Sequence, residues 1–186
     1  KTVEVPVNNQ APQIAKAKAL LAEAKKPLLY IGGGVAMAGA EASLRQFIQK
    51  TRIPAVWTLK AKGSVDYRDE LDLGMLGMHG TPASNFAVQE CDLLIVLGAR
   101  FDDRVTNTPS KFCPDAKIIH IDIDPAAISK TIRADIPIVG TVDSVLRDML
   151  QLVKEGKEKP DAAALKSWWK QLDEWRNEFG LYTKPR

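Results

Sequence analysis

The apolar run Leu93–Leu97 constrains the fold of this chain more than any other feature of its sequence. Its residues, Leu-Leu-Ile-Val-Leu, show no alternation of apolar and polar side chains, which is typical of a strand covered on both faces in a parallel sheet. The run stops at Gly98, and charged residues follow at 100, 102, 103 and 104. Open α/β sheets bind ligands in the crevice beyond the carboxyl ends of their strands. The sequence therefore predicts a parallel α/β fold with a ligand site directly after this strand.

Several other apolar runs alternate with helical patterns along the chain. Strands are predicted at 28–31, 55–58, 71–74, 93–97, 117–121 and 136–139. Helices are predicted at 38–50, at 82–89 behind the cap Thr81, and from the cap Asp143 to about residue 153. Such alternation implies a parallel sheet with helices on both faces. We therefore expect an α/β protein with three α/β/α layers and up to six parallel strands.

The organisation of the chain is predicted to be one domain with tails. Residues 1–154 are assigned to a central domain with an N-terminal extension, and residues 155–186 to a charged linker and a C-terminal amphipathic helix. Because the chain does not begin with Met, we expect it to be a piece of a longer protein. One apolar stripe runs along the last helix: Leu165, Trp168, Leu172, Trp175 and Phe179. Such a stripe is typical of a core, and the alternative is a contact with a neighbouring domain.

Composition excludes several classes of function. The net charge of +3 comes from 26 basic and 23 acidic residues without a basic run, which argues against nucleic acid as a partner. No apolar stretch is long enough to span a membrane, and no signal-peptide pattern is present. Cys91 and Cys113 are not closely spaced, which argues against a disulfide framework or a metal site and favours a reducing compartment. Cys91, directly before a strand, is interpreted as a small buried residue.

A glycine turn, Gly32-Gly33-Gly34, follows the first predicted strand and precedes a helix. Such a turn lets the oxygens of a diphosphate approach the amides of a helix N-terminus. The dinucleotide fingerprint requires a third glycine where this chain has Met37, and the second strand ends in Thr58 rather than in an acidic residue. The turn is therefore weak evidence for NAD and better evidence for some other nucleotide. The alternative is a tight turn without a ligand.

Charged residues follow two of the strands. Asp122 is placed to accept hydrogen bonds from ribose hydroxyls, whereas Asp124 is interpreted either as a second ligand or as the cap of the turn at Pro125. Arg100 and Arg104 suit a phosphate or a carboxylate, because a guanidinium donates two parallel charge-assisted bonds. The alternative is a solvated cluster in which neighbouring aspartates neutralise these arginines.

The two histidines are read differently. His79 lies in a loop, where it either contacts a ligand or serves the loop structure, and His120 is predicted to be a satisfied core residue within a strand. No Ser/His/Asp order, no paired catalytic carboxylates and no metal cluster appears in the sequence. The residues alone indicate a nucleotide-type binding domain without a catalytic set.

Four segments closely resemble the central domain of acetohydroxyacid synthases (acetolactate synthases), in the catalytic subunit. They are Gly-Met-Leu-Gly-Met-His-Gly-Thr at 74–81, Asn-Phe-Ala-Val-Gln-Glu-Cys-Asp at 85–92, Gly-Ala-Arg-Phe-Asp-Asp-Arg-Val at 98–105 and His-Ile-Asp-Ile-Asp-Pro at 120–125. The resemblance covers residues 13–152. It implies a six-stranded parallel sheet of Rossmann-like type that binds FAD.

The resemblance also implies a set of cofactor residues. The turn Gly32, Gly33 and Gly34 is expected near the FAD diphosphate. The positions that match the flavin site are Thr58, Leu59, Leu76, Gly77, Met78, His79, Gly98, Arg100, Arg104, Val105, Asp122 and Ile123. Thr141 departs from the family, which usually carries an aspartate there to hold the adenine end; Thr141 keeps a hydroxyl and loses the carboxylate.

The reaction implied by the resemblance condenses pyruvate with a second 2-keto acid, pyruvate or 2-ketobutyrate, in branched-chain amino acid biosynthesis. Thiamine diphosphate carries the chemistry, and FAD undergoes no net redox change. Arg104 resembles the arginine that binds the carboxylate of the second keto acid, and Met78 and Asp103 resemble residues of the channel that binds herbicidal inhibitors. The motifs for thiamine diphosphate and magnesium belong to flanking domains that do not occur here, so this chain alone is expected to be inactive.

The partners that the resemblance implies are the N- and C-terminal catalytic domains of the same subunit, a second copy in a homodimer or homotetramer, and a small regulatory subunit. The expected location is the cytoplasm of a bacterium, or an organellar stroma or matrix in a eukaryote. The alternative function is a nucleotide (NAD)-binding module or a structural spacer domain of another thiamine diphosphate enzyme, such as glyoxylate carboligase or pyruvate oxidase.

Overall fold

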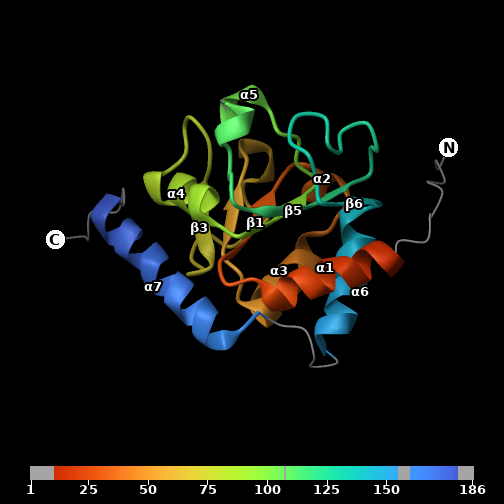
Figure 1. The fold of residues 1–186 in the computed structure, drawn as a ribbon, viewed down its shortest axis with the longest axis horizontal. Helices are drawn as coiled ribbons and strands as arrows, with labels where there is room; N and C mark the ends of the chain where they lie inside the picture. The colour runs from red at the N-terminus through yellow and green to blue at the C-terminus, as the bar shows by residue number, and fades with distance from the viewer. Residues whose placement is uncertain (1–10, 107, 155–159, 180–186) are drawn as a thin grey trace.

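A computed structural model describes residues 11–106, 108–154 and 160–179, without the side chains of residues 103, 104, 152 and 154. The described chain forms a parallel sheet with helices on both faces (Figure 1). The strands are β1 Pro27–Ile31, β2 Ala55–Trp57, β3 Asp72–Met75, β4 Leu93–Leu97, β5 Lys117–Asp122 and β6 Ile136–Val139. The helices are α1 Ala11–Glu23, α2 Gly34–Met37, α3 Glu41–Thr51, η1 Leu59–Ala61, α4 Pro82–Glu90, α5 Asp103–Thr106, η2 Pro109–Lys111, α6 Val142–Lys154 and α7 Ala162–Phe179.

The sheet has six strands in the order β3-β2-β1-β4-β5-β6, and every neighbouring pair is parallel. This order confirms the three-layer α/β/α prediction and the six-stranded parallel Rossmann-like sheet. From β1 the chain adds β2 and β3 on one side and then returns to add β4, β5 and β6 on the other side. The topological switch point therefore lies between β1 and β4, where Ile31 and Leu97 end side by side. In sheets of this kind, ligands bind in the crevice outside the carboxyl ends at the switch point.

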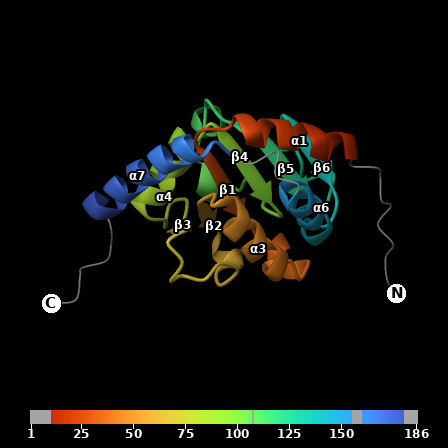
Figure 2. The same ribbon diagram turned by 90° about the horizontal axis from the view of Figure 1, so that it is seen from below.

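Each strand buries alternate residues on opposite faces, which is why the apolar runs show no polar alternation. One face of the sheet packs against α1, α3 and α6, as Figure 2 shows from below. This half of the core includes Leu44 and Phe47 of α3, Leu146 and Met149 of α6, and the strand residue Ile95.

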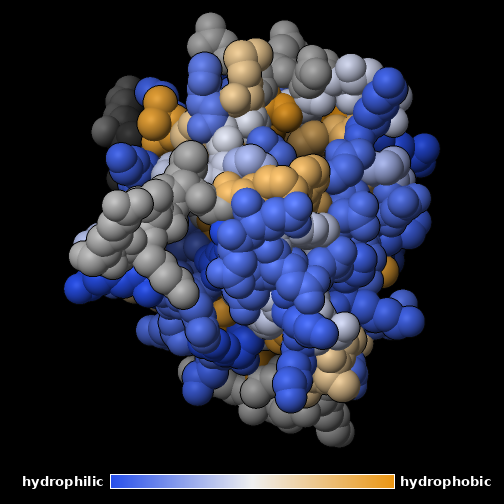
Figure 3. Space-filling model, turned by 90° about the vertical axis from the view of Figure 1, so that its left-hand side faces the viewer, coloured by the Kyte–Doolittle hydropathy of each residue, from blue (hydrophilic) through white to orange (hydrophobic). Residues whose placement is uncertain are grey.

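The other face of the sheet packs against α4 and α7. Trp168 of α7 is buried against this face of the sheet. Its indole nitrogen donates to the carbonyl oxygen of Pro27 at 3.1 Å. Leu165 and Leu172 are buried in the same cluster, which confirms the core interpretation for the first three residues of the aromatic stripe; Trp175 is half-buried and Phe179 is exposed. The outward side of this region is mainly hydrophilic, with apolar side chains visible in small separate areas (Figure 3).

One helix start and one helix cap differ from the prediction. The helix expected at 38–50 is α3, but it begins at Glu41, because Gly39 adopts a left-handed φ of 62° and the amide of Ala40 bonds back to Val35; the short helix α2 before it was not predicted. The cap of α6 is Thr141 rather than Asp143: the Thr141 hydroxyl accepts from the amide of Ser144 at 3.3 Å. Asp143 instead accepts a hydrogen bond from the Ser43 hydroxyl at 2.6 Å, which ties α6 to α3.

The remaining predictions on chain organisation fall partly outside the described residues. The first ten residues of the predicted N-terminal extension and residues 155–159 of the charged linker are not described. Within the described ranges, no helix is long and apolar enough to cross a membrane. Cys91 and Cys113 are free and buried, and burial raises the pKa of both thiols, which confirms that Cys91 is a buried core residue.

Candidate functional site

The glycine turn after β1 and Gly98 after β4 are in direct contact at the switch point. The amide of Gly32 donates to the carbonyl oxygen of Leu97 at 2.9 Å, and the amide of Gly34 donates to that of Gly98 at 2.9 Å. A Cβ atom on Gly32 would lie 2.2 Å from the Gly98 oxygen, and one on Gly34 would lie 2.7 Å from the Gly98 Cα. Only glycine permits this approach, because any side chain would overlap backbone atoms that have no room to move.

This contact changes the role predicted for the amides of the turn. The Gly34 amide is occupied by Gly98, and the amide of Val35 bonds to the carbonyl oxygen of Gly32 at 3.2 Å. These two amides are therefore not free for a diphosphate. The turn instead brings two chain segments together at the switch point.

Lys60 is a residue of this region that the sequence analysis did not assign to the site. The Cβ atom of Lys60 lies 3.0 Å from the place that a Cβ on Gly33 would take, so the stem of this lysine packs over the turn. Lys60 belongs to η1 directly after Thr58 and Leu59. The sequence signal that could have identified Lys60 is its position directly after two predicted cofactor residues, Thr58 and Leu59. The contact places the stem of an exposed lysine over the glycine turn.

The other predicted cofactor residues follow neighbouring strands at the same edge of the sheet. Hydrogen bonds continue one residue past the strands, from the amides of Thr58, Leu76, Gly98 and Gly140 to the carbonyl oxygens of Ile31, Trp57, Ile121 and Asp122 at the ends of adjacent strands. The loops thus leave the sheet from a common line. The structure brings the following residues to this edge: Thr58 and Leu59 after β2, Leu76, Gly77, Met78 and His79 after β3, Gly98 and Arg100 after β4, Asp122 and Ile123 at the end of β5, and Thr141 after β6.

Large apolar side chains are exposed at this edge. Leu59 is 70% exposed, Met78 74% and Ile123 50%. Met37, at the end of α2, is 91% exposed and was not predicted as a site residue. Exposed apolar side chains at the edge of the sheet that also carries the glycine turn suit a ligand with a flat apolar ring and a polar tail.

The acidic residues after β5 have distinct roles. Asp122 is nearly buried, and one of its carboxylate oxygens accepts from the amide of Asp124 at 2.9 Å. Asp124 is exposed and accepts from the amide of Ala126 at 2.9 Å, which confirms that it caps the turn at Pro125. Asp122 is therefore the carboxylate that is held in place at the end of a strand.

The residues predicted for substrate binding lie on two loops. Met78 is at the exposed tip of the loop after β3. Asp103 and Arg104 lie in α5, where the structure describes their backbone but not their side chains. Val105, on the same short helix, is half-buried and packs against the part of the core that lies on the α4 and α7 side of the sheet.

Two buried polar side chains hold the backbone of the turn that follows β4. The Tyr30 hydroxyl donates to the carbonyl oxygen of Arg100 at 3.4 Å, and His120 Nε2 lies 2.9 Å from the carbonyl oxygen of Ala99. Burial raises the pKa of Tyr30, so this hydroxyl keeps its proton. The ring of Phe101 packs edge-on against both Tyr30 and His120. The side chain of Arg100, which is exposed, is therefore carried by an anchored backbone.

The protonation state of His120 follows from its contacts. A carbonyl oxygen only accepts, so Nε2 carries the proton, and Nδ1 is buried without a partner among the described residues. Protonation at Nδ1 would create a buried cation without an acceptor. Burial accordingly lowers the pKa of His120 below its usual 6.5, although the Ala99 bond and Asp122 act in the opposite direction. His120 is thus a core residue, as predicted, but only one of its two nitrogens is satisfied.

We expect this histidine to make the chain less stable in mild acid. Below pH 6.5 the unfolded chain takes up a proton that folded His120 does not, so the free energy of unfolding falls by up to about 1.4 kcal/mol per pH unit until the lowered pKa is reached. The variant His120→Gln keeps a nitrogen donor for Ala99 and does not titrate. Urea unfolding between pH 7.5 and 5 should show a smaller loss in this variant, and equal losses in both proteins would contradict the assignment.

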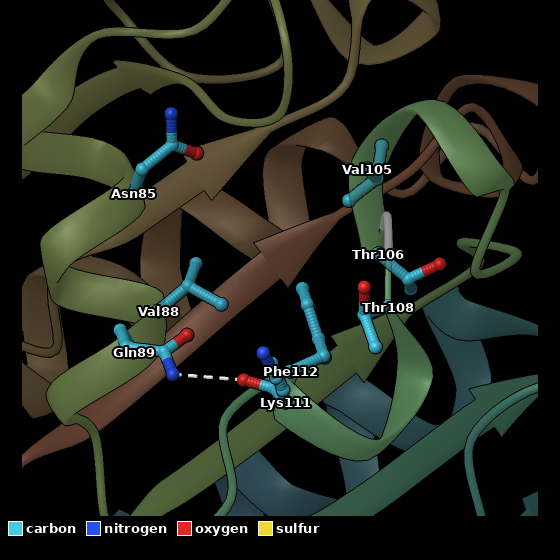
Figure 4. Close-up of a pocket in the computed structure, with 8 residues that line it drawn as sticks. All are labelled: Asn85, Val88, Gln89, Val105, Thr106, Thr108, Lys111 and Phe112. Carbon is cyan, nitrogen blue, oxygen red and sulfur yellow. Dashed lines mark hydrogen bonds between the residues drawn. The ribbon is translucent and has the colours of Figure 1, made fainter.

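A cavity of about 270 Å³ opens between α4 and the segment that contains α5 and η2 (Figure 4). Its lining residues are Asn85, Val88, Gln89, Val105, Thr106, Thr108, Lys111 and Phe112. Gln89 reaches across it and donates to the carbonyl oxygen of Lys111 at 2.8 Å. The cavity shares only Val105 with the predicted cofactor residues, so it is separate from the glycine turn. In the described ranges, no group of three or more His, Cys, Asp or Glu residues is arranged to hold a metal ion.

Comparison with known families matches residues 14–149 to the family described as thiamine pyrophosphate enzyme, central domain. The match includes all six strands and every predicted site residue. The chain belongs to this central-domain family. Its switch point, glycine turn and anchored loops are therefore features of a thiamine pyrophosphate enzyme central domain.

Curated relatives of this central domain carry the name acetolactate synthase. The chain is 44% identical to the acetolactate synthase large subunit of Cyanidium caldarium over 91% of its length and 29% of the relative. It is 42% identical to the acetolactate synthase isozyme 3 large subunit of Escherichia coli (strain K12), over 88% of this chain and 29% of the relative. It is 52% identical to the probable acetolactate synthase large subunit of Methanocaldococcus jannaschii, over 81% of this chain and 24% of the relative. The central domain thus spans less than a third of the length of each.

Proposed function

We propose that this chain is the FAD-binding central domain of an acetolactate synthase large subunit. The observation that carries the proposal is the convergence of the predicted cofactor loops on one edge of the sheet, at a switch point where Gly32, Gly34 and Gly98 keep side chains away. The names of the relatives support the enzyme assignment, and the chemistry of this edge supports the cofactor.

The described residues fit the three parts of FAD. The exposed side chains of Leu59, Met78 and Ile123 offer apolar surface to the isoalloxazine ring. Lys60, over Gly33, and exposed Arg100 offer positive charge to the diphosphate. These groups are the ones that would hold the cofactor here.

Asp122 and Thr141 fit the ribose and adenine end. Asp122 has its carboxylate fixed at the end of β5 and is able to accept from ribose hydroxyls. The Thr141 hydroxyl already caps α6, so it contributes less at the adenine end than a free carboxylate would. When bound, FAD supplies a structural framework beside the site of condensation and no net redox chemistry.

The activity of the complete protein is proposed on the same basis. The condensation of pyruvate with a second 2-keto acid would require thiamine diphosphate and Mg²⁺ on flanking domains, together with the subunit partners expected above. Arg104 would bind the carboxylate of the second keto acid, and Met78 and Asp103 would line the approach to it. The 186-residue chain alone is expected to form no acetolactate.

Titration of the purified chain with FAD, and separately with NAD, tests the proposed function. We expect calorimetry to show binding of FAD and no binding of NAD, because Met37 replaces the third glycine of the NAD fingerprint and Thr58 replaces an acidic ribose ligand. Tight binding of NAD would overturn the proposal. Binding of neither nucleotide would show that this chain does not form the site without its flanking domains.

A further inference from the structure

Asn85 forms two hydrogen bonds with the backbone of a single residue, Gly77. The Asn85 Oδ1 atom accepts from the Gly77 amide at 2.8 Å, and the Asn85 Nδ2 atom donates to the Gly77 carbonyl oxygen at 3.0 Å. Asn85 is at the fourth position of α4, and Gly77 is in the loop after β3. The side-chain amide thus holds both polar groups of one residue, as a neighbouring strand would do.

The loop needs such a support because of its shape. Gly77 has a left-handed φ of 90°, and the amide of Gly80 bonds back to the Gly77 oxygen at 2.9 Å. A Cβ atom on Gly80 would lie 2.4 Å from the Met75 oxygen, so the loop is folded tightly on its own base. Met78 and His79, between these two glycines, are exposed. Their position is therefore fixed through Gly77 and Gly80.

We infer that Asn85 is a positioning residue that pre-orders the Gly77–Gly80 turn, so that Met78 and His79 face the FAD ring. This inference rests on the proposed function. The hydrogen bonds of the Asn85 side chain reach the predicted cofactor site through the backbone of Gly77. A pre-ordered loop binds a ligand more tightly, because less conformational entropy is lost on binding.

A purely structural role for Asn85 would appear as a loss of domain stability when the residue is replaced. Asparagine is a poorer helix former than alanine, so Asn85→Ala improves the intrinsic stability of α4 while it removes two bonds between exposed groups. We therefore expect little net change in the stability of the domain. A loss of cofactor affinity at unchanged stability separates positioning from folding.

The matched control is Gln89, one turn later on α4. Its side chain also donates to a backbone carbonyl, but to that of Lys111 at 2.8 Å rather than to a residue of the loop after β3 (Figure 4). Gln89→Ala removes a comparable hydrogen bond from the same helix.

The experiment compares the wild-type chain, Asn85→Ala and Gln89→Ala in three measurements: amide hydrogen exchange of residues 76–80, FAD affinity by calorimetry, and the urea midpoint of unfolding. For Asn85→Ala we expect about tenfold faster exchange of the Gly77 amide, an FAD Kd raised about tenfold, and an unchanged midpoint. The visible circular dichroism of bound FAD should also change, because the ring contacts a looser loop. Gln89→Ala should behave as the wild type.

The outcomes separate the inference from the proposed function. Unchanged exchange of the Gly77 amide in Asn85→Ala overturns the inference whether or not FAD binds. Faster exchange with wild-type FAD affinity also overturns it, because the loop would then not matter for the cofactor. If the wild-type chain binds no FAD, this chain does not form the site without its flanking domains; wild-type exchange of the Gly77 amide in Asn85→Ala would then still overturn the inference, because Asn85 would not order the turn.

Discussion

Replacing Gly32 by alanine is expected to destabilise the chain by about 3 kcal/mol or more and to abolish FAD binding. The added methyl group would lie 2.2 Å from the Gly98 oxygen, 2.4 Å from the Ala99 Cα and 2.5 Å from the Ala99 Cβ. Two of these atoms belong to the backbone directly after β4, which hydrogen bonds hold on both sides. Relief of the overlap would separate β1 from β4 at the switch point.

Gly140→Ala is the matched control for this substitution. Gly140 also follows a strand at the carboxyl edge, but a Cβ atom there would meet only the side chain of Val145, at 3.3 Å. We expect a change within about 1 kcal/mol, because a side-chain methyl group is able to shift by a few tenths of an ångström. Urea unfolding followed by far-ultraviolet circular dichroism measures both variants. Similar stability of Gly32→Ala and Gly140→Ala would show that the two turns are not packed as described.

Truncation of Trp168 to alanine is expected to cost about 3–5 kcal/mol of unfolding free energy. The side chain is only 1% exposed, packs edge-on against Trp175, and donates to the carbonyl oxygen of Pro27 at the start of β1. Its removal leaves a large cavity between α7 and the sheet and an unpaired carbonyl group. The C-terminal helix should therefore detach together with a general loss of stability.

Trp169 provides the comparison for this second substitution. It is the next residue of α7, it is half-buried, and its indole nitrogen donates to the carbonyl oxygen of Arg52 at 3.0 Å. Trp169→Ala removes the same side chain at a site with less burial, so we expect less than half of the effect of Trp168→Ala. Equal effects in chemical unfolding would mean that α7 does not bury Trp168 against the sheet.

The strands could be predicted from sequence because their signal is local. The run Leu93–Leu97 lacks polar alternation, and the structure buries it on both faces as the centre of the sheet. The aromatic stripe of the last helix likewise predicted the buried residues Leu165, Trp168 and Leu172, although its last residue, Phe179, is exposed. Element boundaries were predicted less well: the helix expected from residue 38 begins at Glu41, after the left-handed Gly39, and Thr141 rather than Asp143 caps α6.

The sequence predicted which residues gather at the candidate site, but not the contacts that those residues make. Strand ends of a parallel sheet share one edge, so Asp122, Gly98 and the glycine turn were expected to meet there. Their partners were not predictable in the same way. The Gly34 amide was expected to be free for a ligand and is bonded to Gly98, and the anchors Tyr30 and His120 were not assigned to the loop that they hold.

The sequence by itself determined the α/β alternation, the edge at which ligand-type residues gather, and the resemblance that led to the family. Only the tertiary structure decided that Gly32 touches Gly98, that Trp168 reaches Pro27, and that Asn85 holds Gly77. The physical reason is the range of the interactions. Periodicity and turn propensity act over a few neighbouring residues, whereas contacts between segments depend on strand order and register, which are fixed only when the whole sheet assembles.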